Sequence, residues 1–310
     1  MSYEFISPRD HIGDILNGFA KENDKIVVID SDLATSVTTH KFQKEYPNRF
    51  FEMGIAEQNS MSIAAGLATE GLIPFYVNFS IFCTGTVWTQ LRQVCYANLN
   101  VKIIGTHPGM DNGPDGATHH ALEDIALSRA LPNLRVLSPV DLEDLKSCIK
   151  LALEIKGPVY IRVARDLVPI IHEKENKNYE TIEVLADDGN DYAIVFEGTA
   201  AKQAILGYEM LKMEGYKNKL ISLRIIKPLD VEGLKRELSG VKGILTVENH
   251  TINGGIGSAI AEIIAENNMK IKLKRIAVLD TFTESGKTSE VKEKYGISEN
   301  NIKETIINFN

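Results

Sequence analysis

The run from residue 106 to residue 120 carries the densest set of side chains that could do chemistry. It holds three of the seven histidines of the chain, and His107, Asp111, Asp115 and His119 stand four residues apart. On a helix this spacing would gather the four groups on one face, where they could bind a metal ion. The prolines and glycines of the same run exclude a helix. We therefore expect no metal site here, and predict a glycine-rich loop that binds a polyhydroxylated or anionic substrate.

Glu57 belongs to a second candidate segment, which runs from residue 50 to 59 and leads into a helix of small residues. Its neighbours are apolar, and a buried carboxyl group favours its protonated form and could donate or accept a proton. The alternative is that Glu57 lies in the first turn of the helix because the helix dipole favours a carboxylate there. Spacing alone favours this second explanation.

Three aromatic side chains, Tyr76, Phe79 and Phe82, follow one another at intervals of three residues. Such a row could stack on a planar ring, although packing in the core is the commoner use of aromatic residues. Pro74 and Gly85 nearby indicate an irregular segment rather than a regular helix. Residues 71–91 carry no charge and are long enough to span a bilayer, but their polar groups would lack partners in lipid. We therefore predict a buried strand, a loop and a helix here.

These segments need a scaffold, and apolar β-branched runs that alternate with amphipathic stretches predict one. Continuous apolar strands separated by helices indicate an α/β fold with a mostly parallel sheet that is covered on both faces. Asp141 should cap the last helix of the first half. In that half we expect strands at residues 25–29, 73–77, 101–105, 134–137 and 159–163, and helices at 9–22, 56–69, 86–98, 121–130 and 142–155.

A polar, strongly charged stretch at residues 172–188 divides the chain and is typical of a linker. A second alternation follows it. We predict two doubly wound α/β domains, at residues 1–175 and 191–310, joined by a linker at 176–190. In the second domain we expect strands at residues 192–196, 218–223, 243–247 and 273–278, and helices at 199–213, 231–238 and 257–266.

Composition limits the class of protein. A length of 310 residues suggests about two domains. The net charge of −8 disfavours broad binding to nucleic acid or to anionic membranes. The odd number of cysteines, Cys83, Cys95 and Cys148, without a CxxC pair, indicates reduced thiols. No basic segment followed by an apolar run begins the chain, so no signal peptide is visible. We expect a soluble, cytoplasmic protein with no nucleic-acid or membrane partner.

A glycine turn at residues 253–257 precedes the last of these helices. It departs from the GxGxxG nucleotide-binding pattern because Ile260 stands where the last glycine should be. Close packing of the helix on its strand explains these glycines better than nucleotide binding does.

Taken in order, these segments resemble the C-terminal half of a thiamine-diphosphate-dependent transketolase. The resemblance covers nearly the whole chain and implies a pyrimidine-binding domain followed by a transketolase C-terminal domain. It rests on Gly54-Ile55-Ala56-Glu57-Gln58-Asn59, on the aromatic row with Asn78, on Asp115-Gly116-Ala117-Thr118-His119, and on Glu248-Asn249-His250 with its glycine turn.

The resemblance implies transfer of a two-carbon ketol unit from a ketose (phosphate) to an aldose (phosphate). Glu57 would be catalytic and would hydrogen-bond a ring nitrogen of the cofactor's aminopyrimidine, while His107 and His119 would bind sugar oxygens and move protons. The implied cofactor-binding residues are Glu57, Asp32, Tyr76, Phe79 and Phe82. The implied substrate-binding residues are Arg9, Ser36, His107, Asp115, His119 and Arg165. Two guanidinium groups, a hydroxyl and an imidazole suit a phosphate dianion.

One motif of such enzymes is missing. The segment that holds the diphosphate and its metal begins Gly-Asp-Gly and ends in Asn, and the nearest fragment here, Asp188-Gly189-Asn190, does not match it. The resemblance therefore implies that a partner, an N-terminal-section transketolase subunit, holds the diphosphate with Mg²⁺ or Ca²⁺. We expect a heterotetramer of two plus two subunits, and no activity from this chain alone.

The loop also departs from the family pattern. His120 stands where glutamine often occurs, Ala117 replaces a frequent proline, and Asp111 stands where small or apolar residues are usual. A carboxylate near a bound phosphate would repel it by roughly a few kcal/mol at an effective dielectric of about 20. We therefore hypothesise that Asp111 shifts the donor or acceptor away from the sugars of the pentose phosphate pathway.

Three other functions remain open. The beta subunit of a 2-oxoacid dehydrogenase decarboxylating component shares the glutamate and the two-domain plan, but needs the phosphate-binding set less. A deoxyxylulose-phosphate synthase fragment ranks third, because the loop begins Thr106-His107 instead of Asp-Arg. A non-catalytic partner subunit of the same fold is the alternative outside enzymes.

Overall fold

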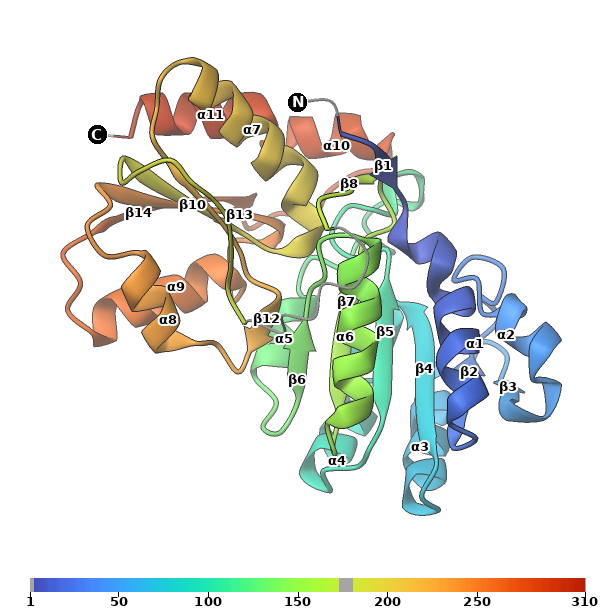
Figure 1. The fold of residues 1–310 in the computed structure, drawn as a ribbon. Coiled ribbons are helices and arrows are strands. Elements are labelled where there is room, and N and C mark those ends of the chain that lie inside the picture. Colours follow the sequence, from blue (N-terminus) through green and yellow to red (C-terminus); the bar gives the residue numbers. More distant parts are fainter. Residues whose placement is uncertain (1–2, 173–180, 310) are drawn as a thin grey trace.

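Two α/β units make up the computed structural model, which describes residues 3–172 and 181–309 (Figure 1). The second unit packs on one end of the first unit's sheet, next to β6, β7 and β5 in the view of Figure 1. One cluster of buried apolar side chains runs through both units. The two predicted α/β domains are therefore confirmed as units that share a core.

A seven-stranded sheet forms the centre of the first unit. Its order is β12-β6-β7-β5-β4-β2-β3, and every pair is parallel except the edge pair β12–β6. The inner strands β2, β4, β5 and β7 are buried along their whole length, which explains their continuous apolar sequences. The strands are β2 (Ile26–Asp30), β3 (Phe50–Glu52), β4 (Ile73–Phe79), β5 (Lys102–Thr106), β6 (Arg135–Leu137), β7 (Val159–Val163) and β12 (Ile225–Lys227).

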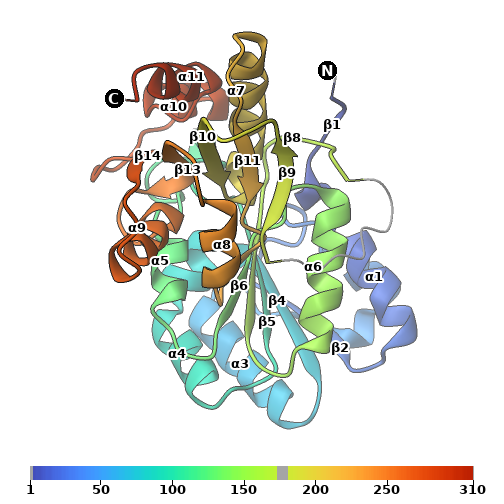
Figure 2. The ribbon, with the colours of Figure 1, turned by 60° about the vertical axis from the view of Figure 1, so that its left-hand side comes forward.

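Helices cover both faces of this sheet, as Figure 2 shows. Apolar side chains of α1 and α6 pack on one face, and those of α3, α4 and α5 pack on the other. Asp141 caps α6 as predicted, because its side chain accepts a hydrogen bond from the Asp144 N–H at 3.0 Å. The helices are α1 (Ile12–Glu22), α2 (His40–Glu45), α3 (Glu57–Thr69), α4 (Trp88–Tyr96), α5 (Asp124–Arg129) and α6 (Leu142–Glu154), with short helices η1 (Pro8–His11), η2 (Pro47–Arg49) and η4 (Gly113–Asp115) and a π-helical turn η3 (Ile81–Thr86).

The second unit repeats this plan around a five-stranded sheet of order β14-β13-β10-β11-β9. Helices α8 and α9 pack on one face, and α7 and α11 on the other. Its elements are β9 (Glu183–Asp187), β10 (Tyr192–Phe196), η5 (Gly198–Ala200), α7 (Ala201–Met213), β11 (Lys219–Ser222), α8 (Val231–Glu237), β13 (Gly243–Thr251), α9 (Ile256–Glu266), β14 (Lys272–Val278), α10 (Thr288–Lys294) and α11 (Glu299–Ile307). A small antiparallel pair, β1 (Phe5–Ile6) with β8 (Val168–Pro169), completes the fold.

The predicted linker at residues 176–190 needs correction. Residues 183–187 form strand β9, which pairs antiparallel with β11 at the edge of the second sheet. An edge strand exposes one side and tolerates charge, so its composition was mistaken for that of a linker. Residues 176–180 lie outside the described part of the chain.

Strand β12 belongs by sequence to the second unit but extends the sheet of the first. It pairs antiparallel with β6, and the Ser138 N–H donates to the Arg224 carbonyl at 2.8 Å beside it. A strand of three residues is too short for a side-chain period to be recognised in the sequence, and β12 was therefore not predicted.

Buried Arg162, at the centre of β7, ties the units together. Its guanidinium group donates to the Asp124 carboxylate of α5 at 2.7 and 3.1 Å. From the second unit, Glu197, Thr199 and the Asn249 carbonyl accept at 2.9, 2.5 and 2.8 Å. A buried polar network around Arg162 therefore joins the units beside their shared apolar cluster.

The uncharged residues 71–91 form strand β4, the π-helical turn η3 and the start of α4, as predicted. Among the described residues, no helix combines the length and the apolar character that crossing a membrane requires.

Candidate functional site

The carboxyl ends of the parallel strands form the edge at which ligands bind in folds of this kind. Asp32 follows β2, the η3 turn with Phe82 follows β4, His107 follows β5 and Arg165 follows β7. Glu57 begins α3 after the end of β3. The topology thus brings most predicted site residues to one edge of the first sheet, although they come from distant parts of the sequence.

An aromatic wall, formed by Phe79, Phe82, His107 and His119, lies at this edge. The rings of Phe79 and Phe82 are nearly parallel, with centroids 6.0 Å apart and an interplanar angle of 16°. The His107 ring lies 4.0 Å from Phe79, and His119 meets Phe82 edge-on at 5.4 Å. The wall therefore offers flat apolar area beside imidazole nitrogens, which suits a heteroaromatic ring or a sugar.

Tyr76 does not share this wall. Tyr76 and Phe79 lie on one strand at an odd spacing, so their side chains point to opposite faces of the sheet. Tyr76 is fully buried, and its hydroxyl accepts a hydrogen bond from Asn78 Nδ2 at 2.8 Å. The single face that the spacing suggested is therefore not formed, and a cofactor contact by Tyr76 stays a prediction.

Glu57 is half-buried and is the first residue of α3. That position agrees with a carboxylate favoured by the helix dipole, and it lies after the end of β3, at the ligand-binding edge. Gln58 Nε2 donates to the Thr86 carbonyl at 3.2 Å and so fixes the start of α3 against the η3 turn. Burial is the main cause that raises the pKa of Tyr76, and the charge of Glu57 adds to it.

Asp32 is exposed in the loop after β2, with a positive φ of 60°. Its N–H donates to Glu52 Oε1 at 2.8 Å, and the Gly54 N–H donates to the same oxygen at 2.9 Å. Glu52 thereby joins this loop to the segment that leads into α3. Sequence analysis missed Glu52, whose only signal was its place at a strand end.

The predicted phosphate-binding residues converge on one cluster. Arg9 Nη1 donates to the Ser36 carbonyl at 2.6 Å, so the backbone of Ser36 makes this contact rather than its hydroxyl. Arg9 Nε is buried and finds no hydrogen-bond partner in the described part of the chain. Burial, with the charges of Arg9 and Arg165, lowers the pKa of His107 to about 3. Two guanidinium groups and a neutral imidazole thus meet around an unsatisfied donor, an arrangement suited to an anion.

Asp111 overturns the hypothesis that its carboxylate repels a bound phosphate. Asp111 is fully buried, and Lys292 Nζ lies 2.8 Å from its Oδ1. Its Oδ2 accepts the Arg165 N–H at 2.9 Å, and Asn249 Nδ2 donates to Oδ1 at 2.9 Å. The carboxylate is neutralised within the protein, so the argument that it shifts substrate preference is wrong.

The remaining loop residues point in different directions. Asp115 is exposed at the end of η4, and no hydrogen bond of its side chain occurs in the described ranges. His119 is half-buried, and its Nδ1 lies 2.9 Å from Thr118 Oγ1. His120 is buried instead against the second unit, with Nδ1 2.6 Å from Thr283 Oγ1. The structure therefore places His119, but not His120, on the aromatic wall.

Two family models match the chain. The transketolase pyrimidine binding domain matches residues 5–170, and the transketolase C-terminal domain matches residues 180–302. The chain belongs to the transketolase family. A putative transketolase C-terminal section of Methanocaldococcus jannaschii is 41% identical over 304 residues, which are 96% of this chain and 95% of that protein. A 6-deoxy-6-sulfo-D-fructose transketolase subunit of a Clostridium species is 35% identical, over 94% of this chain and 90% of its own length.

Solved structures agree with this membership. A structure described as a split gene transketolase, inactive beta4 tetramer, shares 39% sequence identity with this transketolase-family chain and has a TM-score of 0.89. The match covers 98% of each chain.

The glycine turn of this transketolase-family chain packs a helix and leaves no room for a nucleotide. Glu248 accepts hydrogen bonds from the N–H groups of Ile256 at 2.8 Å and Gly257 at 3.1 Å, and so fills the start of α9. A Cβ on Gly255 would lie 1.9 Å from Glu248 Oε2, which explains the glycine. The interpretation as close helix packing is confirmed.

Within the described ranges, no group of three or more His, Cys, Asp and Glu side chains is placed to hold a metal ion. The aromatic wall offers a flat apolar face whose chemistry suits the pyrimidine ring of a thiamine cofactor.

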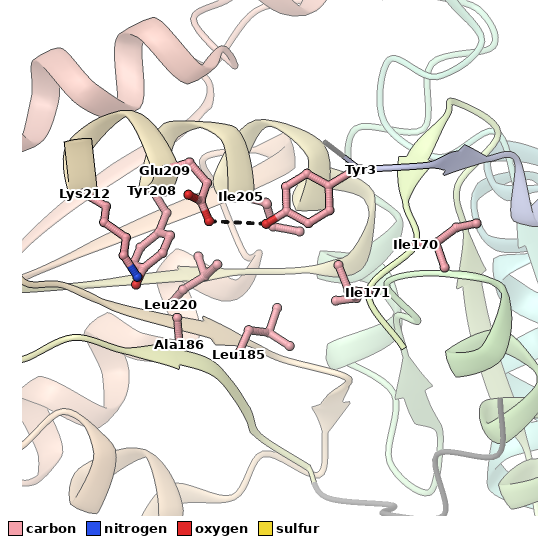
Figure 3. A pocket seen from close by; sticks show the side chains of 10 residues that line it. All are labelled: Tyr3, Ile170, Ile171, Leu185, Ala186, Ile205, Tyr208, Glu209, Lys212 and Leu220. Carbon is pink, nitrogen blue, oxygen red and sulfur yellow. Dashed lines mark hydrogen bonds between the residues drawn. The ribbon is translucent and has the colours of Figure 1, made fainter. Parts of the chain in front are cut away.

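A cavity of about 430 Å³ lies outside this edge (Figure 3). It is formed between α7, β9 and residues 170–171, and its walls are mostly aliphatic. Tyr3 closes one side by donating a hydrogen bond to Glu209 Oε1 at 3.3 Å. None of the predicted site residues lines it.

Proposed function

We propose that the chain is the C-terminal subunit of a split transketolase, which transfers a two-carbon ketol unit from a ketose to an aldose through thiamine diphosphate. One observation carries the proposal. Glu57, the aromatic wall and the Arg9–Arg165 pair come from elements whose ends meet at one edge of the sheet. The similarity to a putative transketolase C-terminal section supports the proposal.

Thiamine diphosphate, when bound, supplies the carbon nucleophile and the electron sink for breaking the ketose C–C bond. The chain's own residues bind and orient. Phe79 and Phe82 would hold the aminopyrimidine, and Glu57 would hold a proton for a ring nitrogen of it. His107, whose imidazole is neutral because of burial and two nearby guanidinium groups, can donate or accept a hydrogen bond at a sugar oxygen.

The substrates we propose carry an anionic end group, which the free donors of Arg9 and Arg165 would bind. The names of two relatives fit this choice, since one is a 6-deoxy-6-sulfo-D-fructose transketolase subunit and another an apulose-4-phosphate transketolase subunit. Asp115 and His119, which lie nearer the open surface, would contact hydroxyl groups of the donor. Ser36 contributes its carbonyl to hold Arg9.

The partner in this proposal is an N-terminal-section transketolase subunit that holds the diphosphate and Mg²⁺ or Ca²⁺. Two copies of each subunit would form the active assembly. Ile55, two residues before Glu57, is exposed and would contact the partner subunit. A similar split protein is described as an inactive tetramer of one subunit type, which supports dependence on a partner. The three free, buried cysteines suit a reducing, cytoplasmic setting.

The test compares the purified chain alone with the chain mixed with an N-terminal-section subunit, thiamine diphosphate and Mg²⁺. We expect ketol transfer from a ketose phosphate only in the mixture, with a mass that matches two plus two subunits. Turnover by the chain alone would refute the need for a partner. Release of CO₂ from a 2-oxo acid without ketol transfer would instead assign the dehydrogenase component.

A pair of variants separates chemistry from folding. Glu57→Gln should lower kcat of the mixture by about 100-fold or more, because the carboxyl group that holds a proton is lost. Glu70→Gln changes an exposed carboxylate at the end of the same helix and should leave kcat unchanged. Equal activity of both variants would remove Glu57 from the mechanism.

A further inference from the structure

A lysine of the second unit reaches the substrate edge of the first. Lys292 lies on α10 and is 2% exposed, and its Nζ is 2.8 Å from Asp111 Oδ1 and 3.3 Å from Asp166 Oδ2. Burial alone would lower the pKa of Lys292, but the two carboxylates outweigh burial and raise it, so the ammonium stays charged. An ion pair of this kind is costly to bury and needs exact geometry.

Asp111 links this ammonium to Arg165 through two contacts. Its Oδ2 accepts the backbone N–H of Arg165 at 2.9 Å, and its carbonyl accepts from Arg165 Nη1 at 3.2 Å. The Asp166 N–H donates to the same Oδ2 at 3.2 Å. Asn249 of β13 adds a fourth contact, since its Nδ2 donates to Asp111 Oδ1 at 2.9 Å. Asp111 therefore holds the backbone of Arg165 through its carboxylate and the guanidinium group of Arg165 through its main-chain carbonyl.

Arg165 needs such support because of its neighbour. Burial is the main cause that lowers the pKa of Arg9; the Asp10 carboxylate, 2.9 Å from Arg9 Nη2, acts against it, and the charge of Arg165 lowers the pKa further, so the two guanidinium groups lie close enough to repel each other. Repulsion would move a free guanidinium group away. Within the guanidinium group of Arg165, Asp111 engages only Nη1, and the other donors can serve a ligand.

We propose that Lys292 and Asp111 are positioning residues for substrate affinity, through which the C-terminal domain holds Arg165 in place for the anionic end of the substrate. This proposal rests on the proposed function and assigns a role to the C-terminal domain, which contributes no predicted site residue of its own. Neither residue touches the reacting carbon, so their effect falls on KM for anionic substrates and not on kcat.

The test uses the mixture of both subunits and Lys292→Met, with Lys287→Met as the matched control. Lys287 precedes the same helix, is 80% exposed and pairs only with Glu290 among the described residues. Lys292→Met should raise KM for a ketose phosphate about tenfold with kcat nearly unchanged, because a misplaced guanidinium group weakens a charge-assisted contact. KM for the same ketose without its phosphate should not change, and Lys292→Arg should restore most of the affinity.

Equal changes for both ketoses, or a loss confined to kcat, would overturn the proposal. A second measurement does not depend on turnover, so it also separates this proposal from the proposed function. Inorganic phosphate is titrated against the isolated chain, with the His107 ring signals as the readout in NMR. Wild type and Lys287→Met should bind alike, and Asp166→Asn, which removes one partner of Lys292 at a partly exposed position, should bind more weakly. Unchanged phosphate binding in Asp166→Asn and Lys292→Met would refute the positioning role.

Discussion

Replacing Arg162 by methionine tests the polar contact between the two units. All five N–H donors of the guanidinium group find acceptors, and two of these acceptors, the carboxylates of Asp124 and Glu197, have side chains with no exposure. Methionine fills a similar volume but leaves both carboxylates buried without a counter-charge. Breaking a buried ion pair in this way costs about 3–5 kcal/mol. The expected loss is a large share of a total stability that is about 5–15 kcal/mol in ordinary proteins.

The loss should also depend on pH. In the wild type, burial alone would raise the pKa of Glu197, but Arg162 and Thr199 outweigh it and the pKa lies below its ordinary value. Without Arg162, burial dominates and the carboxyl group is favoured in its protonated form. When folding raises the pKa of an acidic group, that group makes the folded protein less stable as the pH rises. The deficit of Arg162→Met should therefore be larger at pH 8 than at pH 5.

Urea unfolding followed by the fluorescence of Trp88, the single tryptophan, measures this loss. Trp88 is half-buried, and its Nε1 donates to the Leu127 carbonyl at 3.4 Å, so unfolding changes its surroundings. Arg135→Met, at an exposed position on the neighbouring strand β6, is the control and should stay within about 0.5 kcal/mol of wild type. A loss in Arg162→Met below about 1 kcal/mol, or one that is the same at both pH values, would refute this reasoning.

Three further outcomes are expected. Burial alone would lower the pKa of His172, but hydrogen bonds to Asp141 and Glu183 raise it to about 10. The stability that protonated His172 adds to the fold is therefore complete below its ordinary pKa of 6.5 and is lost as the pH rises through about 10. The difference in unfolding free energy between wild type and His172→Gln should thus close on going from neutral pH to about pH 10, and a constant difference would contradict the assignment. Gly109→Ala should lower the stability measured by thermal unfolding by more than about 1 kcal/mol, because φ is +57° and the new Cβ would lie 2.1 Å from the Asn249 carbonyl oxygen. A variant as stable as wild type would show that the loop adapts. A thiol reagent should label no cysteine in the native protein and three after unfolding, because all three thiols are buried and burial raises the pKa of each. Rapid labelling of the native protein would argue against the buried positions of Cys83, Cys95 and Cys148.

Strands buried on both faces were predictable to within two residues. β2, β5, β7 and β10 are continuous apolar runs, and sequence alone identifies such runs. β9 was missed because its burial does not alternate and no position in it is fully buried, and β12 because it has only three residues. The local pattern of apolar residues shows which strands are buried, but it does not show which strands pair with each other.

The candidate site shows the same division. Residue types predicted a substrate loop, which stays a prediction, and the resemblance added Arg9 and Arg165, which the fold brings together. Sequence could not show that Asp111 is neutralised, because its partner Lys292 comes from the end of the other domain. Arg162 gave a usable signal, a charge within an apolar strand, which in a buried sheet demands partners.

The placement of β12 affects how such proteins can be recombined. A fragment that ends at residue 172 would lack Ile225–Lys227 and would expose β6 as a new sheet edge, ready to pair with a second molecule. Exchange of the C-terminal domain between homologues would replace a strand of the recipient's first sheet as well. A chimera that keeps this segment with the first domain should therefore stay monodisperse where a simple swap aggregates.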